Sequence, residues 1–378
     1  MADIVNDLTF DGLEFLRENG AKRAGEYGDQ PSFFGTPSET EPSNADDALS
    51  TPHCDRGYEI PEGSWKRISV REAPQFAWTD PLMPLRFVDG KDVGRVVAYV
   101  ASPGGFPVPI RLSQIGAIAL RAVPPAHNDL NNGITLRVEV RHIDKVVSLM
   151  ADLFPWDEIE RFAAGLRARG FRLLISRRIG QDDDPRNFTW LQENVRYRSR
   201  EEMFRLERRA ASAYHRKGDP SLVTITDGRL DDKEEIVRGE APLIGIVKSH
   251  ASTSYLHPEG WDVLYALRPA ERTPALALTT EKLELVTWYV RLADSAGGPL
   301  DGVVRVEMSQ AFFESTVSGE VAYMDRLSRA LCMWRTHDSG YGRAKVTLHP
   351  IQQAEDRLGA HFIPTDTLVS RFYKLSGL

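Results

Sequence analysis

The chain has 378 residues, a formal net charge of −7, 42% hydrophobic residues and 27% charged residues, as in an ordinary globular protein. No run approaches the roughly 18 apolar residues of a membrane-spanning helix, and the first residues lack the basic and apolar regions of a secretory signal. With only Cys54 and Cys332, a disulfide framework and a cysteine-based zinc site are not expected, and we predict a cytoplasmic protein.

The first 60 residues are predicted to be an extension of the main fold. Residues 8–24 have the apolar and charged pattern of an amphipathic helix, and residues 28–62 are rich in Pro, Ser, Thr and Gly. Such a composition is typical of a linker rather than of a packed element. We therefore expect residues 1–60 to mediate assembly and residues 61–378 to form the main domain.

The next part of the chain predicts a β-meander followed by a helix. Runs of β-branched residues bounded by Gly, Pro and Asn predict strands at residues 85–89, 94–101, 115–122 and 135–141. The tetrapeptide Ser102-Pro-Gly-Gly105 is expected to form a hairpin turn. Helical periodicity follows at residues 154–169, and another strand is expected at residues 171–176.

The second half of the chain begins with a helix at residues 201–217, which leads directly into a strand at residues 222–227. The remaining predictions are strands at residues 243–248, 262–267 and 303–308, and helices at residues 321–334 and 350–361. A meander that starts with an Asp-bearing strand, followed by a helix and a second Asp-bearing strand, has the connectivity of an RNase H-like fold. This is an α/β architecture with a mixed sheet flanked by helices.

Two Asp-Gly pairs follow apolar runs, at Asp89-Gly90 and Asp227-Gly228. Each pair alone is typical of a turn, because Asp bonds its own backbone and Gly accepts a positive φ. Glu207 lies 20 residues before Asp227 on the predicted helix, so that the helix can turn back and bring the two carboxylates together. Asp356 on a late helix is the fourth candidate, and its neighbour Glu355 competes for that role.

These carboxylates have two alternative explanations. Hydrolysis of a phosphodiester with two divalent cations needs several anionic oxygens, which Mg²⁺ and Mn²⁺ prefer as ligands. However, a helical Glu such as Glu207 commonly pairs with an Arg one turn away, and Asp356 could lie on the surface. Spacing alone leaves a metal site and a set of structural carboxylates as equal alternatives.

A basic segment precedes the second Asp-bearing strand, although the protein is acidic overall. Residues 161–217 contain 15 Lys and Arg against 7 Asp and Glu. Such a stripe is expected of a surface that follows nucleic-acid phosphates, and the alternative is a solvated helix face with internal ion pairs. The arginines predicted to contact DNA are Arg196, Arg198, Arg200, Arg205 and Arg208.

Taken in order, these motifs resemble the NurA nuclease family over residues 84–365. The matching segments are Phe87-Val-Asp89-Gly90, Leu206-Glu207, Ile225-Thr-Asp227-Gly228-Arg-Leu230, Gly245-Ile-Val-Lys248-Ser249, Trp288-Tyr289-Val-Arg291-Leu292, Val304-Arg305-Val-Glu307 and Gln353-Ala354-Glu355-Asp356. The part from Asp227 to Lys248 is the most specific. Arg229 departs from the family pattern, in which a small hydroxyl residue is usual.

The resemblance implies a deoxyribonuclease that acts as a 5′–3′ exonuclease, a single-strand endonuclease, or both. Two Mn²⁺ or Mg²⁺ ions would be held by Asp89, Glu207, Asp227 and Asp356. Lys248 would neutralise or position the scissile phosphate, and Arg291 would line the DNA path. The resemblance also implies a homodimer that works with a hexameric HerA-type ATPase translocase in DNA end resection or antiviral defence.

Two other hypotheses remain. The chain could be a non-catalytic RNase H-like adaptor that binds DNA and loads or caps a translocase, although the intact set Asp89, Glu207 and Asp227 argues against this. A Piwi-like guide-binding protein shares the fold, but the chain is short for that class and shows no separate guide-anchoring domain. No phosphate-binding Gly-x-x-x-x-Gly-Lys-Ser/Thr motif is present, so the chain has no ATPase motor of its own.

Overall fold

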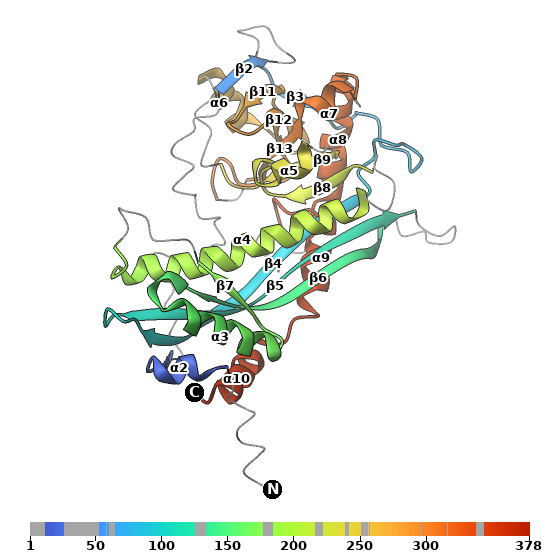
Figure 1. Cartoon of the computed structure of the whole chain (residues 1–378). Coiled ribbons are helices and arrows are strands. Elements are labelled where there is room, and N and C mark those ends of the chain that lie inside the picture. The colour runs from blue at the N-terminus through green and yellow to red at the C-terminus, as the bar shows by residue number, and fades with distance from the viewer. Residues whose placement is uncertain are drawn as a thin grey trace.

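The structure, a computed structural model, describes residues 12–25, 53–57, 59, 65–124, 134–176, 184–215, 222–238, 242–250, 256, 258–295, 297–315, 317–337 and 344–378. In this part of the chain, 13 strands form one mixed sheet with helices on both faces (Figure 1). The main path through the sheet follows the order β2-β11-β12-β13-β9-β8-β4-β5-β6-β7. The predicted fold class, an α/β protein with a mixed sheet flanked by helices, is confirmed.

The strands at the centre of the sheet have the RNase H-like connectivity. Strands β4 (Arg86–Ala101), β5 (Pro107–Val123) and β6 (Thr135–Leu149) form a long antiparallel meander. Strands β8 (Thr224–Asp227) and β9 (Leu243–Val247) lie on the other side of β4 and run parallel to it. The long helix α4 (Phe188–His215) precedes β8 in the chain, as predicted, and the central strands lie in the order β6-β5-β4-β8-β9.

Further strands extend the sheet on both sides of this centre. β13 (Val303–Ser309) pairs antiparallel with β9, followed by β12 (Glu284–Arg291), β11 (Leu276–Thr279) and β2 (His53–Gly57). β7 (Arg172–Ile175) pairs parallel with β6. The short strands β1 (Lys22–Arg23), β3 (Ile68–Ser69) and β10 (Glu271–Arg272) pair at the margins.

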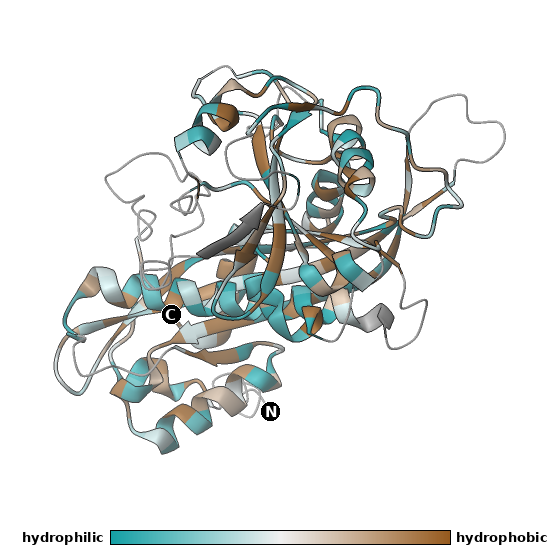
Figure 2. Cartoon of the chain, turned by 90° about the horizontal axis from the view of Figure 1, so that it is seen from above, coloured by the Kyte–Doolittle hydropathy of each residue, from teal (hydrophilic) through white to brown (hydrophobic). Residues whose placement is uncertain are grey.

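The helices form three groups, each over its own hydrophobic cluster. The helices α4, α5 (Glu234–Val237) and α6 (Pro258–Ala266) cover one face of the sheet, whereas α7 (Gln310–Ser315), α8 (Val321–Trp334) and α9 (His349–Gly359) cover the other. At the far end of the long strands, α2 (Glu14–Glu18), α3 (Trp156–Ala168) and α10 (Thr365–Ser376) enclose the third cluster (Figure 1). Hydrophobic residues concentrate in the strands (Figure 2), and no described helix is long and apolar enough to cross a membrane.

The first Asp-Gly pair lies inside a strand, not at the end of one. The strands predicted at residues 85–89 and 94–101 are one continuous strand, β4, because β5 pairs with it along almost its whole length. The break predicted at residues 90–93 is therefore wrong. The tetrapeptide Ser102-Pro-Gly-Gly105 does form the hairpin turn, in which the Ser102 amide donates to the Phe106 carbonyl oxygen (2.9 Å).

Two further element predictions were wrong. Residues 262–267 were predicted as a strand, but most of them belong to α6, which begins at Pro258, a residue favoured in the first helical turn. The predicted helix at residues 201–217 begins earlier, at Phe188, because apolar residues such as Leu191 and Val195 continue its buried face towards the N-terminus.

The N-terminal segment belongs to the packed body where it is described. Leu13, Phe15 and Leu16 are buried in the third cluster, and the Phe15 ring stacks on Phe162 at a centroid distance of 4.8 Å. β1 pairs with β4, and β2 adds a strand to the sheet. These contacts correct the expectation that residues 1–60 lie outside the main domain, and the linker predicted at residues 28–62 falls largely outside the described residues.

Candidate functional site

The parallel pairing of β4 with β8 brings the two predicted aspartates side by side. Phe87 pairs with Ile225 and Val88 with Thr226, so Asp89 and Asp227 occupy the next position in register. Because side chains alternate along a strand, Asp89 shares the face of Phe87, and Asp227 shares the face of Ile225. Neighbouring strands lie about 4.8 Å apart, so the two carboxylates project from adjacent backbones into one region.

The second Asp-Gly pair forms the expected turn at the end of β8. Gly228 has a φ of 83°, and its amide donates to the Ile246 carbonyl oxygen (2.9 Å) and to Oδ1 of Asp227 (3.1 Å). The chain then crosses over β9 at Gly245, where a Cβ atom would lie only 2.9 Å from the Gly228 oxygen. The glycine at position 245 therefore leaves space for the turn that fixes one Asp227 oxygen.

The Arg-x-Glu motif on β13 holds this turn in place. Oε2 of Glu307 accepts a hydrogen bond from the Leu230 amide (2.9 Å), and Arg305 donates to Oε1 of the same carboxylate (2.6 Å). All three residues are buried. Their role is to position the chain that leaves Asp227.

Glu207 reaches the site from the opposite face of the sheet. A Cβ atom on Gly90 would lie 2.4 Å from Oε1 of Glu207 and 2.8 Å from its Cγ, so the Glu207 side chain occupies the space beside Gly90. The pairing of β4 with β8 ends at Val88, because β8 stops at Asp227. The glycine and the end of β8 together let a carboxylate from α4 approach Asp89.

Three lysines surround the carboxylates. Nζ of Lys248 donates to Oδ2 of Asp227 (2.8 Å). Nζ of Lys233 donates to the backbone oxygen of Asp227 (2.9 Å) and lies 3.7 Å from Oε2 of Glu207. Nζ of Lys91 lies 3.0 Å from Oε1 of Glu355.

Sequence reasoning identified Lys248 but missed the other two lysines. Lys91 lies two positions after Asp89 and thus on the same face of β4, a signal that strand alternation could have given. Lys233 is only 2% exposed and belongs to a short 3₁₀ helix, Asp231–Lys233, that no sequence pattern singled out.

The fourth carboxylate of the site is Glu355 and not Asp356. Glu355 pairs with Lys91, and its charge contributes to raising the pKa of Asp89. Asp356 is exposed and lines a separate hollow with residues from the end of α8. Consecutive residues on a helix point about 100° apart, so only one of the two can face β4, and the prediction of Asp356 is corrected to its neighbour.

Burial, together with neighbouring negative charges, raises the pKa values of Asp89 and Glu207. The pKa of Asp89 lies well above its ordinary value because of burial first, and then the negative charges of Asp227 and Glu207. The pKa of Glu207 rises from 4.5 to about 7, again mainly through burial, although nearby Lys233 acts in the opposite direction. Both groups therefore resist ionisation unless a cation stabilises the charged form.

Asp89 is the least compensated member of the group. It is 8% exposed, and its carboxylate makes neither a hydrogen bond nor an ion pair with any described residue. Within the described ranges, no three Asp, Glu, His or Cys side chains already lie close enough to form a metal centre. The available metal-binding atoms are carboxylate oxygens, which suit Mg²⁺ or Mn²⁺. Lysine side chains form ion pairs with three of the four carboxylates, those of Glu207, Asp227 and Glu355.

The predicted DNA-contacting arginines of α4 divide between the two flanks of the helix. Arg198 donates to Glu201 (2.8 Å) and to the Ile175 carbonyl oxygen (2.8 Å), and Arg205 lies 3.6 Å from buried Glu202. These arginines form the internal ion pairs that were the alternative to DNA contact. Arg208 donates to the backbone oxygen of Asp232 (3.2 Å).

The arginines on the other flank have no such partner. Arg196 lies 11 residues before Glu207, about three helical turns, and Arg200 lies 7 residues before it, about two turns. Both arginines are therefore on the same side of α4 as Glu207. The guanidinium of Arg200 lies over the Phe204 ring at 5.5 Å. Among the described residues, neither arginine is paired with a carboxylate.

Arg291 has a structural role. It is 3% exposed and donates to the carbonyl oxygens of Pro299 and Asp301, both at 2.6 Å. Burial lowers its pKa. Its guanidinium fastens the loop between β12 and β13, which corrects the expectation that it lines a DNA path.

The fold and this group of residues define an α/β protein with an RNase H-like sheet and a buried carboxylate site beside β4. Comparison with protein-family models finds no match, and comparison with curated proteins finds none either. The functional assignment therefore rests on the geometry of the site and on the order of motifs in the sequence.

Replacing Gly90 with Ala should displace Glu207 from the site. The added Cβ atom would overlap Oε1 of Glu207, whereas the Gly25→Ala control adds a methyl group where no atom lies within 4 Å. We expect Gly90→Ala to weaken divalent-cation binding in a calorimetric titration by about 10-fold or more, the scale seen when groups that orient metal ligands are changed. Wild-type affinity in a folded Gly90→Ala protein would show that Glu207 does not bind the cation.

Glu207 should make the metal-free protein less stable as the pH rises. The unfolded carboxyl ionises near 4.5 and the folded one near 7, so the folded state holds the extra proton between these values. The associated stability is present below about pH 4.5 and is lost towards pH 7, on the order of 3 kcal/mol. Urea unfolding in EDTA should therefore show a smaller fall from pH 5 to pH 8 for Glu207→Gln than for wild type. Glu193→Gln, an exposed change on the same helix, should keep the wild-type fall, and equal slopes for all three proteins would contradict the prediction.

Proposed function

We propose that the protein is a metal-dependent DNA nuclease of the NurA type. The observation that carries the proposal is the buried Asp89 carboxylate, which lacks a partner among the described residues and is grouped with Asp227, Glu207 and Glu355. A buried carboxylate that forms no ion pair is unfavourable for folding and is typical of a functional site.

The four carboxylates would hold two Mn²⁺ or Mg²⁺ ions, which when bound would activate water and stabilise the leaving oxygen of a phosphodiester. The chain itself positions the ligands. The Gly228 amide fixes Oδ1 of Asp227, while Oδ2 accepts from Lys248. Lys248 would bind the scissile phosphate, and Lys91 orients Glu355.

The partners of this nuclease follow from the motif order of the sequence. We propose a homodimer that receives DNA from a hexameric HerA-type ATPase, in DNA end resection or in antiviral defence. A non-catalytic DNA-binding adaptor of the translocase is the alternative. Cleavage of DNA by the purified chain with Mn²⁺, abolished by EDTA, separates the two, since the adaptor would cleave under neither condition.

The adjacent acidic residues of α9 provide a matched test of the site. Asp89→Asn and Glu355→Gln should each reduce Mn²⁺-dependent cleavage by at least about 100-fold, since even groups that only orient ligands contribute about 10–100-fold. Asp356→Asn should retain nearly full activity, because Asp356 points away from the other carboxylates. Thermal unfolding should show that Asp89→Asn is no less stable than wild type, because the change relieves repulsion. Wild-type cleavage by Asp89→Asn would refute the proposed function, and loss only in Asp356→Asn would reverse the assignment of the fourth ligand.

The flank of α4 that carries Glu207 is the proposed path for the DNA backbone. Arg196 and Arg200 extend from the site along this flank without carboxylate partners in the described part of the chain. The half-buried Phe204 beneath Arg200 adds a ring on which an unpaired base can stack. The paired arginines of the opposite flank are excluded from this path.

Salt dependence distinguishes the two flanks. In the Asp89→Asn background with EDTA, Arg200→Ala should lower the slope of log K against log salt by roughly 0.7–0.9, the value of one phosphate contact. Arg198→Ala, which removes the same charge from the paired flank, should leave the slope unchanged. Fluorescence anisotropy of a labelled oligonucleotide over a salt series measures both. A slope that falls for Arg198→Ala and not for Arg200→Ala would place the path on the other flank.

A further inference from the structure

A hollow of about 460 Å³ lies between the end of α8 and the start of α9. This volume falls within the range of about 300–1,000 Å³ that is typical of sites for small ligands. The residues that matter for its chemistry are Met333, Trp334, Arg335, His349, Gln353 and Asp356. None of them is a ligand in the proposed metal site.

One wall of the hollow is apolar and unusually exposed. Met333 is 54% exposed, which is high for a methionine, and Trp334 is only partly buried. The Trp334 ring packs edge-on against Phe87 at a centroid distance of 5.7 Å, which fixes its orientation. A rigid indole beside an adaptable thioether suits the flat face of a nucleobase.

The remaining lining is polar, and three of its side chains have no hydrogen-bond partner among the described residues. The side chains of His349, Gln353 and Asp356 make no hydrogen bond to any residue that the structure describes. Among the described residues, Arg335 donates to the Thr336 carbonyl oxygen (3.2 Å) and contacts His337 (3.1 Å), neither of which neutralises its charge. The hollow therefore offers a cation for a phosphate group, and an amide and a carboxylate for the edge of a base.

The hollow adjoins the carboxylate site through two contacts. α9 carries Glu355 towards Lys91 and the next residue, Asp356, into the hollow. Trp334 packs on Phe87, which precedes Asp89 by two residues on the same face of β4. A strand cleaved at the carboxylates would thus pass close to the hollow.

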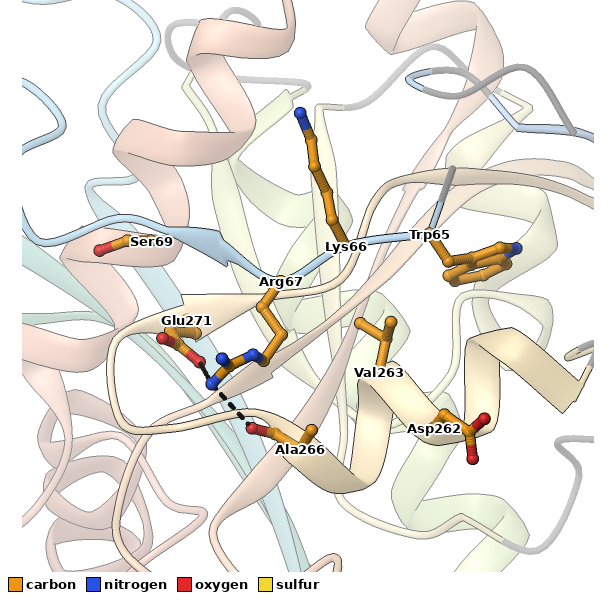
Figure 3. A pocket seen from close by; sticks show the side chains of 8 residues that line it. All are labelled: Trp65, Lys66, Arg67, Ser69, Asp262, Val263, Ala266 and Glu271. Carbon is orange, nitrogen blue, oxygen red and sulfur yellow. Dashed lines mark hydrogen bonds and ion pairs between the residues drawn. The ribbon is translucent and has the colours of Figure 1, made fainter. Parts of the chain in front are cut away.

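Another hollow, beside β3 and α6, has a different character. Its guanidinium group, that of Arg67, bonds to Glu271 and to the Ala266 carbonyl oxygen, both at 3.2 Å (Figure 3). Glu271 neutralises this guanidinium, and Lys66 is the other cation in the lining of this second hollow.

We propose that the hollow between α8 and α9 binds one nucleotide of the substrate strand, with the base against Met333 and Trp334 and the phosphate on Arg335. Gln353 and Asp356 meet the edge of the base, as an amide and a carboxylate do in base recognition. The inference rests on the proposed nuclease function for its link to cleavage, but the binding itself needs no metal and no catalysis. It gives Asp356 a role in holding the substrate, distinct from the metal ligation expected from the sequence.

The test is a titration of the full-length protein in EDTA with deoxyadenosine monophosphate, followed by calorimetry. We expect deoxyribose 5-phosphate, which lacks the base, to bind at least about fivefold more weakly, the fold-change of a single weakly stacked base. Arg335→Gln and Gln353→Ala should each weaken nucleotide binding by at least about fivefold. Arg371→Gln, which removes a charge from an exposed site on α10, should leave it unchanged.

Three outcomes would overturn the inference: no nucleotide binding at millimolar concentration, equal binding of the two phosphates, or unchanged binding by both Arg335→Gln and Gln353→Ala. The Asp89→Asn cleavage assay decides the proposed function separately. Nucleotide binding that depends on Arg335, in a protein that cleaves no DNA, would support the proposed nucleotide site and refute the proposed nuclease function. Cleavage that depends on Asp89, without nucleotide binding at Arg335, would support the nuclease function and refute the nucleotide site.

Discussion

Repulsion among buried carboxylates is the constraint around which this structure is arranged. Asp89, Glu207, Asp227 and Glu355 come from four elements, and the first two are buried while the other two are partly exposed. Burial and like charge both oppose the ionisation of Asp89 and Glu207, so a positive neighbour favours their charged forms. Lysines form ion pairs with Glu207, Asp227 and Glu355, whereas Asp89 forms none with a described residue, and the charge of Lys248 offsets only part of the rise in its pKa. The ionised form of the site is therefore unfavourable on its own, and a bound divalent cation would stabilise it.

The backbone makes this arrangement possible because a short strand and two glycines leave space for the side chains and the turn of the site. β8 is short and stops at Asp227, whereas β4 beside it continues for another 12 residues. The missing neighbour leaves an opening beside Gly90, and the absent side chain of Gly90 widens it for Glu207. Gly245 does the same for the turn after Asp227. Helices on opposite faces of one sheet can then contribute ligands to a common point.

The sequence alone was enough to predict those site residues that belong to a local sequence pattern. Apolar strands followed by Asp-Gly located Asp89 and Asp227, and helical periodicity located Glu207, because these signals depend on neighbours in the chain. The choice between Glu355 and Asp356 depends on how α9 is rotated against β4, which local spacing does not specify. Lys233 reaches the site only because the turn after β8 folds back. The burial of Phe15 against Phe162, likewise, depends on a pairing of distant segments.

The continuity of β4 also limits where insertions and deletions can be tolerated in the chain. Side chains alternate along the strand, so a one-residue insertion between Arg86 and Asp89 would turn Asp89 to the α4 face and break the register with both β5 and β8. The same insertion in the turn at residues 102–105 would change neither. Length variation among descendants of this chain should therefore accumulate in that distal hairpin, which grows or shrinks without moving a ligand.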